Sequence, residues 1–260
     1  MFIKAKKSLG QNFLKSKSAI KKIIEAGSIK TGDTILEIGP GTGILTEEIL
    51  KFDIRLICIE TDFEMIQILK EKFSKEILTK KLTLISGDIT KIKLSTILEK
   101  NTKYKIIANI PYYITGEIIR KFLSAEKEYQ PEKMVLLVQK EVAQRIVAKD
   151  KKESLLSISV KVYCEPKIID VVKAGSFVPA PKVDSAIILF DKISKDFFIK
   201  NKIKENLFFE IIHAGFAHKR KRVLSNLKKI KNIKETDLPQ SMKNERAENL
   251  TITDWLNFIK

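Results

Sequence analysis

The fold of this chain is decided by the stretch Thr34-Ile35-Leu36-Glu37-Ile38-Gly39-Pro40-Gly41-Thr42-Gly43. Residues 34–38 are mostly β-branched or apolar, which is typical of a strand. Three glycines then stand at every second position, and a helical pattern follows over residues 44–51. Because small residues let a ligand approach the backbone closely, a glycine turn between a strand and a helix indicates a nucleotide-type pocket.

Short β-rich runs alternate with amphipathic stretches on both sides of this turn. Strands separated by helices indicate a parallel sheet in a doubly wound α/β layer. The last two strands leave no room for a helix between them, so we expect an antiparallel pair at one edge. Strands are predicted over residues 34–38, 55–59, 82–86, 104–108, 134–138, 167–172 and 185–190, and helices over 44–51, 63–73, 114–123, 142–148 and 155–163.

A different pattern begins after about residue 193. Glycine becomes scarce, and apolar residues recur at helical spacing in two segments that begin near Ile203 and Val223. Residues 253–259 form another short helical pattern, with Thr253 as its N-cap. We therefore expect two domains, an α/β domain over residues 1–193 and a small helical domain over residues 194–260.

Composition narrows the class of protein. The 260 residues carry a net charge of +17, which favours a polyanionic partner, nucleic acid above all. Most basic residues are lysines, so the base composition of the gene is an alternative source of this charge. Two cysteines and two histidines exclude a disulfide scaffold and predict no metal site. Without an apolar run of about 18 residues or a secretory signal, we expect a cytoplasmic protein that enters no membrane.

Carboxylates follow the ends of neighbouring strands. The dinucleotide fingerprint Gly-x-Gly-x-x-Gly seats a pyrophosphate, whereas this turn reads Gly-x-Gly-x-Gly with Glu37 ahead of it, which opposes a phosphate and suits a cationic ligand. Glu60 ends the second strand and can accept from both ribose hydroxyls, and Asp88 follows the third and can accept from an adenine amino group. Together they predict S-adenosyl-L-methionine as cofactor; the alternative is a glycine turn with two acids on solvated loops.

The segment Asn109-Ile110-Pro111-Tyr112 follows the fourth strand and predicts an acceptor site for an exocyclic amine. Such an amine is a poor acid, so a strong base does not help. Two acceptors that hold its N–H groups in line with the methyl donor do help, and the Asn109 side chain with a backbone carbonyl at Ile110 or Pro111 can provide them. Pro111 fixes the turn, and Tyr112 offers a ring on which a flipped base can stack. The alternative is a turn whose Tyr112 packs in the core.

Two further segments are candidates for contact with RNA. In Phe177-Val178-Pro179-Ala180-Pro181, the aromatic ring of Phe177 beside two prolines predicts stacking against the target base, opposite Tyr112. The alternative is that Phe177 closes the edge of the sheet.

The consecutive residues Lys219, Arg220, Lys221 and Arg222 predict contacts with phosphates. If this region is helical, Lys221 recurs on one face with Lys228 and Lys229. The residues Lys4, Lys6 and Lys7 add a basic arm near the start of the chain. The alternative is an ordinary solvated face.

With these motifs in order, the chain resembles the ribosomal RNA adenine N6-dimethyltransferases over nearly its whole length, most closely the bacterial small-subunit branch. The tail departs mildly, since the family more often has Arg-Arg-Lys where this chain has His218-Lys219-Arg220-Lys221, which keeps charge at three of the four positions. Besides the segments already quoted, the resemblance is carried by Gly10-Gln11-Asn12-Phe13-Leu14, Gln139-Lys140-Glu141-Val142, Phe177 through Ala186, Phe216-Ala217-His218 and Arg246-Ala247-Glu248-Asn249-Leu250.

The resemblance implies a Rossmann-like class I methyltransferase, with a mostly parallel seven-stranded sheet, helices on both faces and a C-terminal helical domain that recognises rRNA. It implies dimethylation at N6 of two adjacent adenosines in the 3′-terminal hairpin loop of 16S rRNA, within the small (30S) subunit, by a monomer. In the family the segment at residues 10–14 closes over the cofactor. The residues that bind the cofactor by this resemblance are Asn12, Leu14, Gly39, Glu60, Asp88 and Asn109.

Three alternatives stay open at this point. The sister enzyme of the same fold, which acts on large-subunit rRNA in macrolide resistance, is disfavoured by residues 177–186 and by the tail at Arg246. A non-catalytic ribosome assembly factor on the same fold is disfavoured because the Asn109 motif and Glu60 are intact. A nicotinamide oxidoreductase is disfavoured by the glycine spacing.

Overall fold

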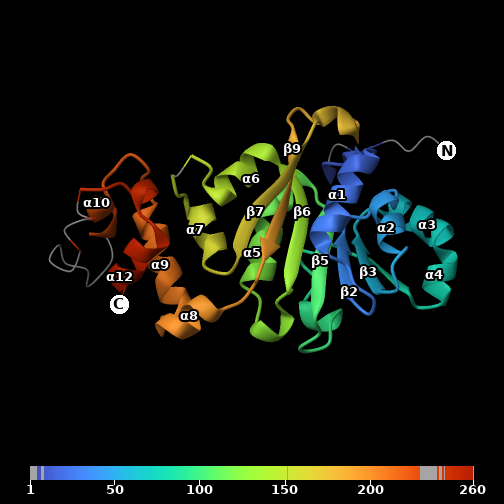
Figure 1. Cartoon of the computed structure of the whole chain (residues 1–260), viewed down its shortest axis with the longest axis horizontal. Helices are drawn as coiled ribbons and strands as arrows, with labels where there is room; N and C mark the ends of the chain where they lie inside the picture. Colours follow the sequence, from blue (N-terminus) through green and yellow to red (C-terminus); the bar gives the residue numbers. More distant parts are fainter. Residues whose placement is uncertain are drawn as a thin grey trace. The chain divides into compact units, whose positions relative to one another are not determined.

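A seven-stranded sheet with the strand order β4-β3-β2-β5-β6-β9-β7 forms the centre of the α/β part of the chain. The structure is a computed structural model that describes residues 5–6, 9–150, 152–228, 239, 242 and 244–259. The chain divides into two compact units, the first made of residues 1–143 and 165–193 and the second of residues 144–164 and 194–260. The elements of each unit can be followed in Figure 1.

The sheet is parallel from β4 to β6, and its last two strands run antiparallel. β9 pairs antiparallel with both β6 and β7, so the edge pair expected from the sequence is confirmed. A β-bulge between Ile168 and Asp170 interrupts the register of β7. The strands of the sheet are β2 (Thr34–Ile38), β3 (Arg55–Glu60), β4 (Leu82–Ser86), β5 (Tyr104–Asn109), β6 (Lys133–Gln139), β7 (Glu165–Val172) and β9 (Ser185–Asp191).

The central strands are buried because both of their faces carry apolar side chains. All five residues from 134 to 138 in β6 are fully buried, as are Ile35 and Leu36 in β2. Such continuous apolar runs are typical of a parallel sheet covered on both faces. The helices of this unit are α1 (Lys17–Gly27), α2 (Ile44–Ile49), α3 (Phe63–Lys72), α4 (Ser74–Leu78) and α5 (Thr115–Leu123), and α6 (Lys140–Val147) leads into the second unit.

Helix α1 fixes the start of the chain on the sheet. It begins after Ser16, whose hydroxyl accepts a hydrogen bond from the backbone N–H of Ala19, and it buries Ile20 and Ile23. It packs against β5, β6, β7 and β9. Just before it, β1 (Phe13–Leu14) pairs antiparallel with β8 (Phe177–Val178). These contacts bring the segment before α1 next to the glycine turn.

The second unit is helical and contains two separate stretches of chain. The Tyr163 hydroxyl donates to Glu205 Oε1 at 2.5 Å, and the Glu153 N–H donates to the Glu248 carbonyl at 2.7 Å, so the stretch at 144–164 is bound to the later one. Gly215 packs so closely on the Trp255 ring that a Cβ has no room there. The helices of this unit are α7 (Leu155–Lys161), α8 (Asp196–Asn201), α9 (Glu205–Gly215), α10 (Val223–Leu227) and α12 (Ile252–Ile259).

Most predicted elements agree with the structure to within two residues, and three features differ. The sequence placed residues 144–164 with the α/β domain, whereas their contacts group them with the helical unit. Helix α12 begins at Ile252, and Thr251 caps it by accepting from the Asp254 N–H at 3.3 Å, so the predicted cap at Thr253 is wrong. Helices α1, α4 and α8 and the short β1–β8 pair were not predicted. Within the described ranges, no helix has both the length and the apolar character that crossing a bilayer requires.

Candidate active site

A cavity lies where the loops after β2, β3, β4 and β5 meet the segment before α1. In an open α/β sheet, ligands bind at the carboxyl ends of the parallel strands. The cavity is therefore in the expected place for a cofactor. Of the predicted site residues, those that line it are Asn12, Leu14, Gly39, Glu60, Asp88, Asn109, Pro111 and Tyr112.

The glycine turn needs its glycines for two different reasons. Gly39, Gly41 and Gly43 all have positive φ angles of 55–79°, which side chains rarely adopt. At Gly43 a Cβ would also lie 2.6 Å from the Phe73 ring, so this glycine permits close packing against α3. At Gly39 the nearest atoms to a Cβ lie at 3.8–3.9 Å, an ordinary van der Waals contact, so only its φ angle requires glycine there.

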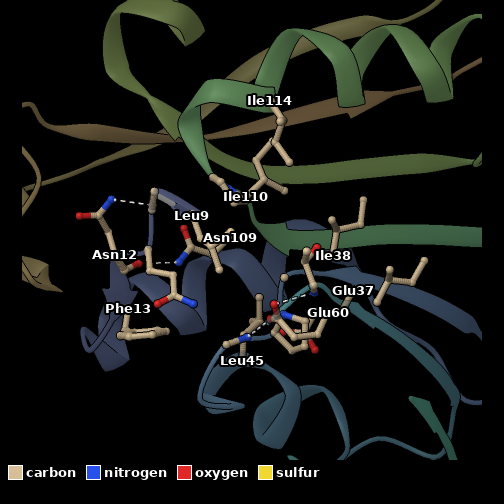
Figure 2. A pocket seen from close by; sticks show the side chains of 18 of the residues that line it. Leu9, Asn12, Phe13, Glu37, Ile38, Leu45, Glu60, Asn109, Ile110 and Ile114 are labelled. Atoms are coloured by element: carbon tan, nitrogen blue, oxygen red, sulfur yellow. Dashed lines mark hydrogen bonds between the residues drawn. The ribbon is translucent and has the colours of Figure 1, made fainter. Parts of the chain in front are cut away.

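Glu60 ends β3, and its carboxylate organises the loops around it. Oε1 accepts from the backbone N–H groups of Thr61 (2.8 Å) and Asp62 (2.9 Å), and Oε2 accepts from that of Gly41 (3.0 Å). A carboxylate has about four lone-pair sites, so Oε2 keeps the capacity to accept from a ligand hydroxyl. Figure 2 shows Glu60 beside Glu37 and Leu45 at the cavity. Glu60 thus holds the glycine turn in place, in addition to its predicted contact with the ribose hydroxyls.

Asp88 lies two residues beyond β4 and is held by a local turn. Its Oδ1 accepts from the N–H (2.9 Å) and the hydroxyl (2.7 Å) of Thr90. The hydrogen bond from the Thr90 hydroxyl is the main reason why the pKa of Asp88 lies below its usual value, against an opposing effect of burial. Asp88 is therefore ionised at neutral pH and can accept a hydrogen bond from an amino group.

Asn109 connects the acceptor segment to the start of the chain. Its Nδ2 donates to the backbone carbonyl of Asn12 at 3.2 Å, and Figure 2 shows the two residues side by side. Because the amide nitrogen is used in this way, the orientation of the side chain is fixed and the carbonyl oxygen is left to accept. An acceptor oxygen at this place is what an exocyclic amine needs.

Tyr112 and Tyr113 follow at the same wall of the cavity. The Tyr112 hydroxyl forms a hydrogen bond of 2.6 Å with Ser185 Oγ on β9. Burial raises the pKa of Tyr112, so the ring is anchored as a neutral phenol. Tyr113 also lines the cavity, is 66% exposed and packs against Gly10. Tyr113 was not predicted as a site residue, although the pair of tyrosines directly after Pro111 is a signal in the sequence.

Glu37 is a buried acid below the glycine turn. It is 1% exposed, and its Oε2 accepts from Thr46 Oγ1 (2.7 Å) and from the Cys58 thiol (3.4 Å). Burial raises the pKa of Glu37 to about 7, which the hydrogen bonds from Thr46 and Cys58 only partly oppose, and nearby Glu60 adds to the increase. Near neutral pH Glu37 is therefore only partly charged, a change from the fixed negative charge that the sequence suggested.

Phe177 occupies a different place from the one the sequence predicted. Its side chain is 2% exposed and packs in the same hydrophobic cluster as Leu14, its partner in the β1–β8 pair. It is not among the residues that line the cavity. A covered ring offers no face to a base, so stacking on the target would require residues 176–179 to move, and that role stays a prediction.

The basic stretch Lys219–Arg222 lies in the turn between α9 and α10 and is exposed. Within the described part of the chain, these four side chains form no ion pair, and Arg222 donates to Asn244 Oδ1 at 3.0 Å. Lys221 precedes α10, so the expected helical face shared with Lys228 is wrong. Lys4, Lys7, Lys229 and Lys231 lie outside the described residues.

The segment before α1 contains contacts that the sequence analysis did not foresee. Lys6, expected in a basic arm, forms an ion pair of 2.7 Å with Asp62, and Gln11 donates to the same carboxylate at 2.7 Å. The position of Asp62, two residues after Glu60, was the one signal in the sequence that this acid lies near the site. Predicting its partners needed the path of the chain before α1.

The strand order, the parallel core and the acids at the strand ends define a Rossmann-like class I methyltransferase. The chain belongs to the ribosomal RNA adenine dimethylase family, whose sequence model matches residues 2–260. Members of this family are methyltransferase enzymes.

Three known proteins show the extent of the similarity. The chain is 39% identical to the ribosomal RNA small subunit methyltransferase A of Dehalococcoides mccartyi (strain BAV1), covering 97% of this chain and 87% of that protein. A crystal structure of a dimethyladenosine transferase from Plasmodium falciparum superimposes with a TM-score of 0.78 at 28% identity, covering 95% of each chain. The structure of the 23S rRNA methyltransferase ErmE has a TM-score of 0.74 at 21% identity, covering 95% of this chain and 98% of that one, and shows a shared fold.

Proposed function

We propose that this protein dimethylates N6 of two adjacent adenosines in the 3′-terminal hairpin loop of 16S rRNA in the small ribosomal subunit, with S-adenosyl-L-methionine as cofactor. The observation that carries the proposal is the Asn109 side chain, which lines the cavity and whose nitrogen donates to the Asn12 carbonyl, so that its oxygen is left to accept. The family and the named small-subunit relatives support the choice of substrate.

The residues at the cavity fit this cofactor. A nucleoside with a cationic tail needs acceptors for its ribose and its amino group, and no site for a phosphate. Glu60 and Asp88 are suited to the ribose hydroxyls and the adenine amine, and Gly39 lines the cavity without a side chain, which permits close approach to its backbone. Leu14 and Asn12 also line the cavity. When bound, the cofactor supplies an electrophilic methyl group.

The acceptor residues then work by position. Asn109 Oδ1 and a backbone carbonyl at Ile110 or Pro111 accept the two N–H groups of the target amine, which fixes the nitrogen lone pair towards the methyl donor. The Asn109 amide does not take up the proton that the target amine loses, so this proton passes to solvent after methyl transfer. Tyr112, anchored through Ser185, supports the base. The same site must accept the monomethylated amine again.

The helical unit supplies RNA contacts in this proposal. The exposed stretch Lys219–Arg222 binds phosphates, and the first unit, which contains the cavity, holds the cofactor. Residues 144–164 belong with the helical unit by their contacts, so the recognition part includes them. We propose that the protein acts in the cytoplasm as a monomer.

The test is methylation of purified ribosomal subunits. The full-length protein is incubated with labelled cofactor and, separately, with unmethylated small and large subunits, and the label is mapped by mass spectrometry of the digested rRNA. We expect dimethyladenosine at two adjacent positions near the 3′ end of 16S rRNA, with little monomethyladenosine after long incubation. Label confined to large-subunit rRNA would replace this proposal with the sister activity, and a lasting monomethyl product would contradict the proposed pocket.

A matched variant tests whether the protein is instead a non-catalytic assembly factor. Tyr113→Phe keeps the ring at the cavity and serves as a control, while Asn109→Ala removes the acceptor oxygen. If small subunits receive no label from the unaltered protein but bind it tightly, the assembly role is favoured. If label appears and depends on Asn109, the enzyme is favoured.

A further inference from the structure

Asp62 is a nearly buried carboxylate that holds two distant parts of the first unit together. Its side chain is 1% exposed and caps α3 by accepting from the Glu64 N–H at 3.0 Å. The same carboxylate accepts from Lys6 Nζ at 2.7 Å through Oδ1 and from Gln11 Nε2 at 2.7 Å through Oδ2. A helix cap needs only the first of these contacts.

The two extra donors belong to the segment that closes one side of the cavity. Residues 9–14, here called the N-terminal strap, all line it. The Lys6 N–H also donates to Gln11 Oε1 at 2.8 Å, so Lys6, Gln11 and Asp62 form a closed set of hydrogen bonds at the start of the strap. Burial acts to raise the pKa of Asp62, but the hydrogen bonds from Lys6 and Gln11 outweigh it and keep the pKa below its usual value. The carboxylate is therefore charged at neutral pH.

The other end of the strap has separate attachments. Asn109 donates to the Asn12 carbonyl, β1 pairs with β8, and the Lys15 N–H donates to the Ser176 carbonyl at 2.8 Å. Among the described residues, the first half of the strap is attached to the segment after β3 mainly through Asp62, and Lys6 forms a second, longer ion pair of 3.4 Å with the exposed Glu64. If that contact is lost, the start of the strap keeps the packing of Gly10 against Tyr113, while β1 stays paired.

Asp62 is also placed next to the cofactor-binding acid. Its backbone N–H donates to Glu60 Oε1 at 2.9 Å, so the same short segment after β3 holds both the predicted ribose acceptor and the attachment of the strap. Residues 9–14 and Glu60 line the same cavity, so opening of the strap would uncover the cavity beside Glu60.

We propose that Asp62 is a positioning residue that keeps the N-terminal strap closed over the cofactor cavity through Lys6 and Gln11, and that this contact sets the rate at which the cofactor leaves. The inference rests on the proposed use of S-adenosyl-L-methionine. It assigns to Lys6 a role in cofactor retention, in place of a contact with RNA.

The test measures release of S-adenosyl-L-methionine from the full-length protein by stopped-flow displacement, with the dissociation constant from calorimetry. Asp62→Asn keeps the shape and the capping oxygen but loses the charge, and Lys6→Met removes the partner. We expect each to release the cofactor about 5- to 100-fold faster than the unaltered protein. Lys6→Arg keeps the charge, so it should release the cofactor as slowly as the unaltered protein, in contrast to Lys6→Met.

Two controls separate this role from a general effect on the fold. Lys22→Met breaks a comparable ion pair of 2.6 Å with Asp170, and neither residue lines the cavity, so it should leave the release rate unchanged. Lys6→Met should melt without cofactor at nearly the same temperature as Lys22→Met. Because Lys6 and Asp62 act together, the double variant should release the cofactor no faster than Asp62→Asn alone.

Several outcomes would overturn the inference. It is wrong if folded Lys6→Met and Asp62→Asn release the cofactor at the unaltered rate, or if Lys22→Met accelerates release equally. If Asp62→Asn does not fold, Lys6→Met and Lys6→Arg still decide the question. An unaltered protein that binds no S-adenosyl-L-methionine would instead refute the proposed cofactor, which the first titration shows before any variant is compared.

Discussion

Replacement of Glu60 by alanine tests both sets of contacts that this carboxylate is proposed to make. In the structure it accepts three backbone hydrogen bonds, from Gly41, Thr61 and Asp62, at 2.8–3.0 Å. In the proposed complex it also accepts from the ribose of the cofactor. Glu60→Ala therefore removes a ligand contact and loosens the glycine turn that surrounds the ligand.

The expected magnitude follows from these contacts. Loss of a charged hydrogen-bonding partner costs about 1–3 kcal/mol, so the dissociation constant of the cofactor should rise about 5- to 150-fold. The three backbone N–H groups regain partners from water that enters the vacated space. We therefore expect the free energy of unfolding to fall by about 3 kcal/mol, less than three separate charged bonds would suggest.

The assay is a calorimetric titration with S-adenosyl-L-methionine, well below the melting temperature of the variant. The control is Glu47→Ala, which removes a carboxylate on α2 that pairs with Lys72 at 2.7 Å and does not line the cavity. The control should bind the cofactor as the unaltered protein does. A folded Glu60→Ala protein with an unchanged dissociation constant would refute the assignment of this residue.

Three further predictions concern other parts of the molecule. Asn109→Ala should lower turnover about 100-fold or more while RNA binding persists, and the pH profile of the chemical step should show no ionisation of this residue; an unchanged single-turnover rate would contradict its role. Alanine at all of residues 219–222 should weaken RNA binding without changing cofactor affinity. The slope of log affinity against log salt concentration should fall in magnitude by somewhat under one unit per lost phosphate contact, and an unaltered slope would show that these residues form only a solvated face. Burial raises the pKa of Glu37 from 4.5 to about 7, so as the pH rises the unfolded chain loses this proton before the folded protein does. The free energy of unfolding of the unaltered protein should therefore fall by about 3 kcal/mol between pH 4.5 and 7, relative to that of Glu37→Gln. Urea unfolding that gives parallel curves of stability against pH for the two proteins would show that Glu37 is not the cause.

The sheet could be predicted from the sequence because its signal is local. A strand buried on both faces reads as an apolar run, as in residues 134–138, and the glycine turn fixes where the parallel order starts. The antiparallel edge followed from the short distance between two strands. By contrast, β1 and β8 have two residues each, too few for any periodicity, and their pairing joins segments more than 160 positions apart.

The candidate site could be predicted in part, for the same reason. Glu60, Asp88 and Asn109 stand at strand ends, where the fold itself brings them together. Phe177 was placed by the chemistry of its ring, but burial against Leu14 depends on the tertiary structure. The partner of Lys6 could not be found from the sequence, because a charged residue near the start of a basic chain gives no sign of a buried acid 56 positions away.

The interrupted path of the chain through the second unit has a consequence for engineering. Residues 144–164 leave the sheet after β6 and return to it at β7, while the rest of the unit follows β9. The hydrogen bond from Tyr163 to Glu205 connects these two stretches. In a chimera that took only residues 194–260 from a relative, the helices after β9 would come from one parent and α7 from the other. The two stretches would then have to form that contact with residues from different parents. Transplanting the second unit between members of this family therefore requires two coordinated segments and three splice points, at positions 143, 164 and 193.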